Sequence, residues 1–382
     1  MLSKSIFMLL IVMMNSIEKR NLKSKKGIFD ETKIKSLKLK NRIFRGSVID
    51  CSFKDGHISK EGLKLYEDLA KNEVGTIFTG TAVVSDYNAF DNNPEFRMDK
   101  DEYIEEYKKL VSLVHKYNAN IMVQLIHNGM NTFSTNKVIY GPSSLPLLNQ
   151  KRNAVEMIKE DILRVENDFV KAAIRAKKAG FDGIEIHAAH LYLLSNFLSP
   201  QYNKRNDEYG GNDENRARFV VETIKKVREA VGNDIILSLK IDSENDEKNG
   251  ITEQGFLTAC KLGEKAGLDL IQVSGFKWTK ERPKNGPYYF DAAKKLAEIV
   301  NIPVLIVGGV RSIDDAEFIL NNSKIQYIAL SRPLICEPDI VKKWKNGDTK
   351  KSKCVSCNNC LKDFWDIGCV FNKKKNKNKD KK

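Results

Sequence analysis

The chain has 382 residues, enough to bury a large core as one big domain or two ordinary ones, and its 41% hydrophobic and 30% charged residues fit a soluble globular protein. A net charge of +14 would indicate a nucleic-acid partner if it gathered on a folded surface. Residues 1–40 carry +7 and residues 371–382 carry +6, which leaves about +1 for the 330 residues between them. The charge therefore excludes a basic folded body, and we predict no nucleic-acid partner.

The two ends of the chain differ from its body. Residues 6–14, IFMLLIVMM, resemble the apolar part of a signal peptide, but they are too short to span a bilayer and no small-residue cleavage site follows. We predict that residues 1–26 lie outside the fold, as a leader or as residues before a true start at Met13 or Met14; export is the alternative. The Lys-rich tail, residues 372–382, is predicted to be disordered. We expect a cytoplasmic protein without a membrane partner.

Strand and helix patterns alternate between the two ends. Short apolar runs predict eight strands, and a helical pattern follows each of them. The strands are expected at residues 42–48, 74–79, 120–125, 183–187, 235–241, 269–274, 303–307 and 325–330. The helices are expected at residues 59–71, 100–117, 161–179, 212–231, 252–266, 289–300, 313–321 and 338–346.

Eight strand–helix pairs are typical of a (β/α)8 TIM barrel. We predict a single barrel over residues 27–346, followed by a short Cys-rich extension over residues 347–371. The alternative is an open doubly wound sheet, which carries a glycine-rich phosphate turn after its first strand. The first strand here runs into Val48 with no such turn, so the barrel is favoured.

Two polar residues lie on otherwise apolar strands. Alternation places Gln124 and Lys240 on the inward face, near the carboxyl ends where barrel enzymes keep their catalytic groups. A buried ammonium group needs a negative partner. That partner is either an interior carboxylate such as Glu185 or a ligand that becomes anionic during a reaction, and the pattern leaves both open.

The last two strands end in residues suited to a phosphate. Gly308 and Gly309 follow the seventh strand, and Ser331 and Arg332 follow the eighth. Glycine lets the backbone approach a phosphate, and arginine donates a fork of hydrogen bonds to it. A tight turn with a surface arginine is the alternative, but two such features on adjacent loops favour a phosphate site.

Six segments, in this order and spacing, resemble the old yellow enzyme family, also called the NADH:flavin oxidoreductase family: KLKNRIFRGS, TGTAVV, VQLIHNG, IEIHAAHLYLLSNFLSPQYNKRNDEYGGNDENRARF, IPVLIVGGV and IALSRPLICEPD. The resemblance covers roughly residues 27–346 and is most specific over residues 184–219. It implies an FMN-containing (β/α)8 barrel. Such a protein takes hydride from NAD(P)H and delivers it to the β-carbon of an α,β-unsaturated carbonyl compound.

The resemblance also implies roles for the H-x-x-H-x-Y pattern after the fourth strand. His187 and His190 would hydrogen-bond the substrate carbonyl oxygen, and Tyr192 would protonate the α-carbon. These residue types suit the reaction, because hydride addition builds enolate charge on the oxygen and aimed donors stabilise it. A tyrosine with a pKa of about 10 keeps its proton at neutral pH and can act as a general acid. Two core histidines beside a packing tyrosine are the alternative.

An FMN site follows from the same resemblance. It implies flavin ring contacts from the first three strands, a cation near N1 of the flavin, and a phosphate site on the last two loops. The residues implied are Ser47, Val48, Gly80, Gln124, Lys240, Gly308, Gly309, Ser331 and Arg332. The chain departs from the family pattern at Gly46–Ser47, where many members have a small residue and a proline, at Arg45, where an apolar residue is usual, and at Ser331, where glycine is usual. These departures bear on the ring environment and the choice of substrate more than on FMN binding.

The C-terminal segment contains four of the seven cysteines, spaced C-x2-C-x2-C-x8-C at Cys354, Cys357, Cys360 and Cys369. Thiolates spaced in this way hold iron–sulfur clusters or zinc. The segment resembles the cluster motif of larger family members such as 2,4-dienoyl-CoA reductases and trimethylamine dehydrogenase, with a shorter last interval. We expect one [4Fe–4S] cluster, with zinc or no metal as the alternatives.

The resemblance thus implies an NAD(P)H-using, FMN-dependent ene-reductase-like enzyme that acts on a small unsaturated carbonyl substrate. The chain stops soon after Cys369, without the FAD- and NAD(P)-binding region of the larger members. NAD(P)H is therefore expected to reduce FMN directly, or a separate electron-transfer protein to feed the cluster. The alternatives are a demethylase- or dehydrogenase-like enzyme running through a cluster and a non-catalytic flavin electron carrier. The pattern selects neither NADH nor NADPH and gives no oligomeric state.

Overall fold

The computed structural model describes residues 25–48, 52–54, 56–86, 95–132, 134, 137–147, 150–243, 250–275, 286–361 and 368–372. The predicted leader and the predicted Lys-rich tail therefore lie outside the described residues, except for Lys25, Lys26 and Asn372. Cys51 also lies outside them. In the part of the chain that is described, no helix is both long and apolar enough to cross a membrane.

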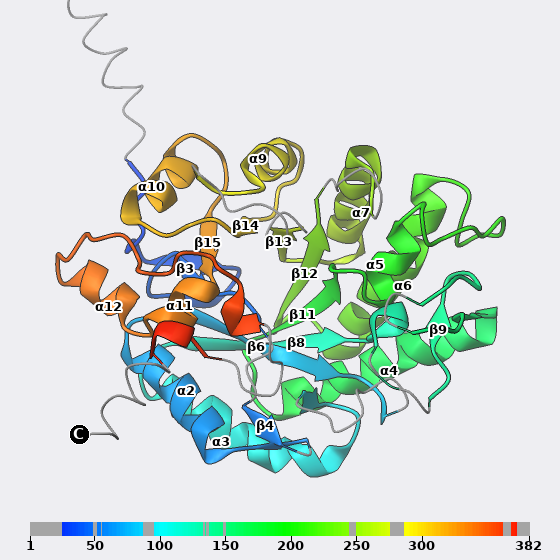
Figure 1. The fold of residues 1–382 in the computed structure, drawn as a ribbon, viewed down its shortest axis with the longest axis horizontal. Coiled ribbons are helices and arrows are strands. Elements are labelled where there is room, and N and C mark those ends of the chain that lie inside the picture. Colours follow the sequence, from blue (N-terminus) through cyan, green and yellow to red (C-terminus); the bar gives the residue numbers. More distant parts are fainter. Residues whose placement is uncertain are drawn as a thin grey trace, which may run out of the picture.

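Eight parallel strands close into a barrel with helices around them (Figure 1). The last barrel strand pairs with the first, so the sheet has no open edge between them. In barrel order the strands are β3 (Ile43–Arg45), β6 (Thr76–Val83), β8 (Asn120–Ile126), β11 (Gly183–Ala188), β12 (Ile236–Asp242), β13 (Leu270–Ser274), β14 (Val304–Val307) and β15 (Tyr327–Leu330). Each lies on one of the eight predicted strands, so the predicted (β/α)8 barrel is confirmed.

The helices pack their apolar faces on the outside of the barrel. Hydroxyl groups cap the amino ends of three of these helices by accepting hydrogen bonds from backbone N–H groups of the first turn. The capping residues are Ser59, Thr252 and Ser312. The long helices are α2 (Lys60–Lys71), α3 (Ile104–His115), α4 (Lys159–Lys178), α6 (Asp213–Val231), α7 (Glu253–Ala266), α9 (Phe290–Ile299) and α10 (Ile313–Asn321), and the short α12 (Ile340–Lys345) follows the last strand. All eight coincide with predicted helices to within a few residues.

Several short elements escaped the sequence patterns. Too few residues take part in each to show a period. They are the hairpin β1 (Thr32–Ile34) and β2 (Leu37–Leu39), the hairpin β4 (Phe53–Lys54) and β5 (His57–Ile58), strand β7 (Phe96–Arg97) beside β6, the pair β9 (Tyr140–Gly141) and β10 (Val155–Glu156), helices α5 (Leu193–Leu198) and α11 (Arg332–Cys336), and the 3-10 turns η2 (Asp101–Tyr103), η3 (Gly129–Asn131) and η4 (Asn359–Leu361).

The interior of the barrel changes from apolar to polar along its axis. Phe44, Phe78 and Met122 belong to an apolar cluster near the amino ends of the strands, and Ile34 and Leu39 of the first hairpin join it from below. Buried polar side chains replace apolar ones toward the carboxyl ends: Gln124, Glu185, His187, Lys240, Asp242 and Gln272. Because unpaired polar groups are costly in a core, this end of the barrel is where a polar ligand is expected.

Candidate active site

The predicted histidine–tyrosine group gathers at the carboxyl end of β11. The ring centroids of His187 and His190 are 5.2 Å apart and nearly perpendicular, and those of His187 and Tyr192 are 5.1 Å apart. His187 is fully buried, while His190 and Tyr192 are partly exposed. The Nδ1 atom of His187 is buried and has no hydrogen-bond partner among the described residues. The three side chains therefore form one group in which a polar atom remains for a ligand.

A strained turn presents His190. His190 and Leu191 have φ angles of 60° and 59°, a left-handed conformation that costs a non-glycine residue free energy and is common at functional sites. The turn is held by buried partners: the N–H of His190 donates to Asp242 Oδ2 at 2.6 Å, and the Asn196 amide donates to the Leu191 carbonyl at 2.9 Å. Asn131 also donates to the His190 carbonyl at 3.1 Å. Side chains from three other segments thus determine where His190 points.

The protonation states suit a hydrogen-bonding group for a carbonyl oxygen. Burial lowers the pKa of His187 and of His190 well below the ordinary value, and the nearby Lys240 lowers both further, so both imidazoles are neutral at neutral pH. Burial and the negative charge of Glu95 raise the pKa of Tyr192. The phenol therefore keeps its proton at neutral pH and above.

Glu185 fixes two amide side chains inside the barrel. Gln124 Nε2 and Gln272 Nε2 each donate to a different carboxylate oxygen of Glu185, both at 2.5 Å. Each amide thus turns its NH2 group to Glu185 and its oxygen elsewhere. The Oε1 atom of Gln272 is buried without a partner among the described residues. This oxygen is an acceptor prepared for a donor from outside the protein.

Lys240 has negative partners in the protein. The carboxylates of Glu185 and Asp242 stabilise its charge, while burial lowers its pKa and Arg45 lowers it further. Burial raises the pKa of Glu185 and that of Asp242 to about 7, against the opposing charge of Lys240. Glu185, the interior carboxylate expected as a partner of Lys240, is therefore present. Its presence leaves room for the other alternative, a ligand that becomes anionic beside the same ammonium group.

The end of β3 is shaped by a close approach to the end of β15. A Cβ atom on Gly46 would lie 2.6 Å from Ser331 Oγ and 3.1 Å from a methyl of Val307, so glycine leaves room for the serine hydroxyl. Gly46, a small residue as in the family pattern, therefore accommodates the hydroxyl of Ser331, which is a departure from that pattern. Ser47 Oγ is buried with no partner among the described residues, and Val48 is half-buried.

The third departure, Arg45, packs between the barrel and α2. Its guanidinium donates to the Phe78 carbonyl at 2.6 Å and lies 5.6 Å from the centre of the Tyr66 ring. The Tyr66 hydroxyl in turn accepts from the N–H of Gly80 at 2.9 Å. The register of β6 against β8 shifts at this point, between Phe78 and Thr81. Gly80 therefore lies at a bulge whose amide is already bonded to the protein.

The predicted phosphate residues come together at the ends of β14 and β15, which are neighbours in the barrel. Gly308 and Gly309 have φ angles of 112° and 85°, and a Cβ atom on Gly309 would lie 2.6 Å from the carbonyl oxygen of Gly286. Arg332 begins α11 beside them. Its guanidinium donates to Asn358 Oδ1, and its Nη2 lies 3.4 Å from Tyr288 Oη. The arginine thus lies between the glycine loop and the cysteine segment.

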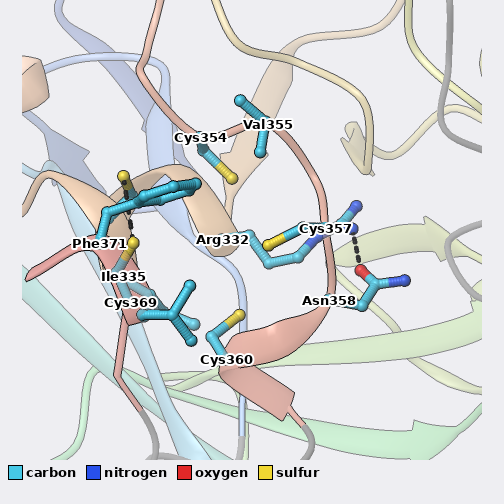
Figure 2. Close-up of a pocket in the computed structure, with 11 residues that line it drawn as sticks. Arg332, Ile335, Cys354, Val355, Cys357, Asn358, Cys360, Cys369 and Phe371 are labelled. Carbon is cyan, nitrogen blue, oxygen red and sulfur yellow. Dashed lines mark hydrogen bonds between the residues drawn. The ribbon is translucent and has the colours of Figure 1, made fainter. Parts of the chain in front are cut away.

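The cysteine segment forms a cavity against α11. Figure 2 shows the sulfur atoms of Cys354, Cys357 and Cys360 facing the space between them, with Arg332 passing beside Cys357 toward Asn358. Cys369 and Cys336 line the same cavity. Over the described residues, no group of three or more His, Cys, Asp and Glu side chains has a geometry that could hold a metal ion. The four motif cysteines therefore share one cavity, without a ready coordination geometry.

The barrel residues fit FMN on observations of this structure. Three buried atoms have no partner among the described residues: Ser47 Oγ after β3, His187 Nδ1 in β11 and Gln272 Oε1 in β13. Gly308 and Gly309 leave a side-chain-free loop next to Arg332, as a phosphate requires. Five thiols line the cysteine cavity, and the four that belong to the motif match the ligand count of an iron–sulfur cluster or of zinc.

Sequence reasoning missed several residues of this region. Asp242 is the last residue of β12, and its carboxylate accepts from the N–H of His190. Ser274 is the last residue of β13, and its hydroxyl contacts the His190 ring. Gln272 shares Glu185 with Gln124. The signal was present, because polar residues at the carboxyl ends of buried strands are unusual in a core. Cys336 carried no such signal, because it lies in a helix outside the cysteine motif.

The fold defines a class, the (β/α)8 TIM barrel, and its buried polar side chains lie toward the carboxyl ends of the strands, where barrels of this class keep their active sites. The model of the NADH:flavin oxidoreductase / NADH oxidase family matches residues 27–351. The chain belongs to this family, and the resemblance inferred from its motifs is confirmed.

Known relatives agree with this assignment. The chain is 33% identical over 358 residues to NADH oxidase of Thermoanaerobacter brockii, covering 90% of this chain and 53% of the relative. It is 33% identical over 314 residues to NADPH dehydrogenase of a Geobacillus species, covering 81% and 91%. The solved structure of 2-naphthoyl-CoA reductase with 2-naphthoyl-CoA matches the fold at a TM-score of 0.83 and 22% identity, over 90% of this chain and 56% of that one. The chain thus spans about half the length of the first and third of these proteins.

Proposed function

We propose that the protein is an FMN-dependent oxidoreductase that takes hydride from NAD(P)H and reduces the activated C=C bond of an α,β-unsaturated carbonyl compound. The observation that carries the proposal is the group of two neutral imidazoles and one protonated phenol at the end of β11. An electron carrier needs neither a carbonyl clamp nor a proton donor. The names of two relatives, NADH oxidase and NADPH dehydrogenase, support a nicotinamide donor.

The residues of the site have distinct tasks in this proposal. Bound FMN supplies the hydride. His187 and His190 bind the carbonyl oxygen, and because their imidazoles are neutral they donate to it without placing a fixed charge there. Charge that develops on this oxygen is stabilised by donors already in place. Tyr192 then gives its phenolic proton to the α-carbon.

FMN is assigned to the strand ends that face this group. Ser47, Val48, Gly80 and Gln124 would contact the ring, with Gln124 offering its oxygen because its NH2 group is bonded to Glu185. Lys240 would hold negative charge near N1, where a cation tunes the flavin potential. Gly308, Gly309, Ser331 and Arg332 would hold the phosphate. We add Gln272 to this set because its buried oxygen has no partner among the described residues.

The second part of the proposal is a [4Fe–4S] cluster on Cys354, Cys357, Cys360 and Cys369. Its support is that these thiols line one cavity and that Arg332, one of the residues assigned to the phosphate, lines the same cavity. A redox centre here would lie beside the flavin site, and zinc would add no electron transfer. Iron and sulfide analysis of anaerobically purified protein tests it. About four iron per chain supports the cluster; one zinc without iron, or neither metal, contradicts it.

Two half-reactions, followed separately without oxygen, test the enzyme proposal. Flavin absorbance should fall on mixing with NADH or NADPH. The reduced protein should then be reoxidised by 2-cyclohexenone faster than a separate sample of reduced protein is reoxidised by air alone. Flavin released by heat should be FMN. Reoxidation by the enone no faster than by air, or released flavin that is FAD, would contradict the proposal.

A further inference from the structure

A fifth cysteine belongs to the cysteine cavity. Cys336, at the end of α11, is not part of the motif, yet its Sγ lies 3.6 Å from Sγ of Cys369 across 33 residues of sequence. Both side chains line the cavity that also contains Cys354, Cys357 and Cys360. A four-cysteine centre uses four thiols, so one of the five is surplus whichever four bind. The surplus thiol is adjacent to a motif cysteine.

The protein holds these two sulfur atoms together. The Asn372 amide donates to the Cys336 carbonyl at 2.8 Å, and its N–H donates to the Cys369 carbonyl at 2.9 Å. Asn372 thus ties the C-terminal segment, which contains Cys369, to the end of α11, which contains Cys336. Figure 1 shows this segment lying beside α11. Cys336 is buried, at 6% exposure, whereas Cys369 is partly exposed. A small oxidant from solvent therefore reaches Cys369 first.

We propose that Cys336 and Cys369 are a disulfide-forming pair that closes when the cysteine cavity holds no metal centre. Closure requires the two sulfur atoms to approach from 3.6 Å to a bond length of about 2.05 Å. This proposal rests on the proposed function in one point, which is that Cys369 is one of the four cluster ligands. A disulfide with Cys336 removes this ligand, so the cluster can be loaded only after reduction.

The oxidant is a low-molecular-weight disulfide such as oxidised glutathione. The Cys369 thiolate attacks one sulfur of this disulfide, forming a mixed disulfide and releasing one small thiol. The Cys336 sulfur then attacks the Cys369 sulfur of the mixed disulfide and releases the second small thiol. Two protein thiols lose two electrons in total, the small disulfide gains them, and the two protons leave on the released thiols.

The experiment uses the full chain, stripped of metal with a chelator under anaerobic conditions and then exposed to oxidised glutathione. Mass spectrometry of a non-reduced digest is expected to give a peptide in which Cys336 is joined to Cys369, and reduction is expected to separate it. Cys260, fully buried in the core, is the matched thiol that should stay unmodified. A disulfide between motif cysteines with Cys336 free, or no disulfide at all, would overturn the proposal.

Metal analysis of Cys336→Ser separates this proposal from the cluster proposal. If the variant binds as much iron as the wild type and forms no disulfide at Cys369, Cys336 is the surplus thiol and the proposal stands. If the variant loses iron, Cys336 is a metal ligand and the proposal is overturned. If wild-type protein binds no metal but still joins Cys336 to Cys369, the cluster proposal fails while the disulfide pair stands.

Discussion

The backbone N–H of His190 donates to the buried carboxylate of Asp242 at 2.6 Å, while Nε2 of the same histidine lies 2.9 Å from the hydroxyl of Ser274. The two contacts hold the residue at its backbone and at its ring. They come from the last residues of β12 and β13, the next two barrel strands after β11, and His190 follows β11. The barrel thus positions the ring although the turn around it has an unfavourable backbone conformation.

Ser274→Ala tests this positioning role. The variant loses one hydrogen bond to the ring, worth about 0.5–1.5 kcal/mol, so a phenol that occupies the carbonyl site should bind about 2- to 12-fold more weakly. Spectral titration of the flavin with the phenol measures the change. FMN content should stay at the wild-type value, because the Ser274 hydroxyl bonds to His190 and not to a residue assigned to FMN. Unchanged phenol affinity would show that Ser274 does not position the ring.

Tyr192→Phe separates the two half-reactions. The variant keeps the ring that packs against His187 but loses the acidic proton. Flavin reduction by NAD(P)H should be unchanged, while reoxidation by 2-cyclohexenone should slow by about 10²-fold or more, the usual contribution of a general acid. Rapid mixing under anaerobic conditions measures both rates. Wild-type reoxidation would mean that water or another acid supplies the proton.

The raised pKa of Tyr192 adds a prediction about pH. Burial and Glu95 raise this pKa above its ordinary value of about 10, so the phenol stays protonated as the pH rises toward 10. Deprotonation of Tyr192 should therefore not slow enone reoxidation up to about pH 9. Any loss of rate that the wild type shows in this range should also be present in Tyr192→Phe. A loss near neutral pH that the variant abolishes would contradict the raised pKa.

The barrel and the histidine–tyrosine group were predictable from the sequence because their signals are local. Eight apolar strands alternate with amphipathic helices, and His187, His190 and Tyr192 lie within six residues of one another. The supporting contacts were not predictable, because they depend on which strands become neighbours. Gln272 meets Glu185 across 87 residues, and Cys336 meets Cys369 across 33. The strained turn at His190 also left no trace in composition.

Glu185→Gln tests the carboxylate that orients the two amides. Glutamine both donates and accepts, so its NH2 group opposes the NH2 group of Gln124 or Gln272 and one amide must turn over. FMN should bind about tenfold more weakly if the amide oxygens contact the flavin. Fluorescence titration of the apoprotein with FMN measures the affinity. Wild-type affinity would show that amide orientation does not affect the flavin.

The same variant should change how stability depends on pH. The folded pKa of Glu185 is about 7, above an unfolded value of about 4.3, so the folded protein binds the extra proton between these two pH values. Stability should therefore fall as the pH rises from about 4.3 to 7. In Glu185→Gln the fall should be smaller, with Asp242 and Glu166 contributing to the remainder because the pKa of each is also raised to about 7. Melting temperatures of the apoproteins across this range measure it, and equal slopes would contradict the assignment.

Arg332→Ala tests the arginine between the phosphate loop and the cysteine cavity. Removal of a charge-assisted hydrogen bond to phosphate costs about 1.5–3 kcal/mol, so FMN should be retained about 10- to 150-fold more weakly. The variant also loses the bond to Asn358 of the cysteine segment. Asn358→Gly is the matched control, because it removes that bond while glycine tolerates the φ angle of 60° at this position. The control should keep wild-type FMN affinity. Equal loss of FMN in both variants would mean that Arg332 acts on FMN through the cysteine segment and not through the phosphate.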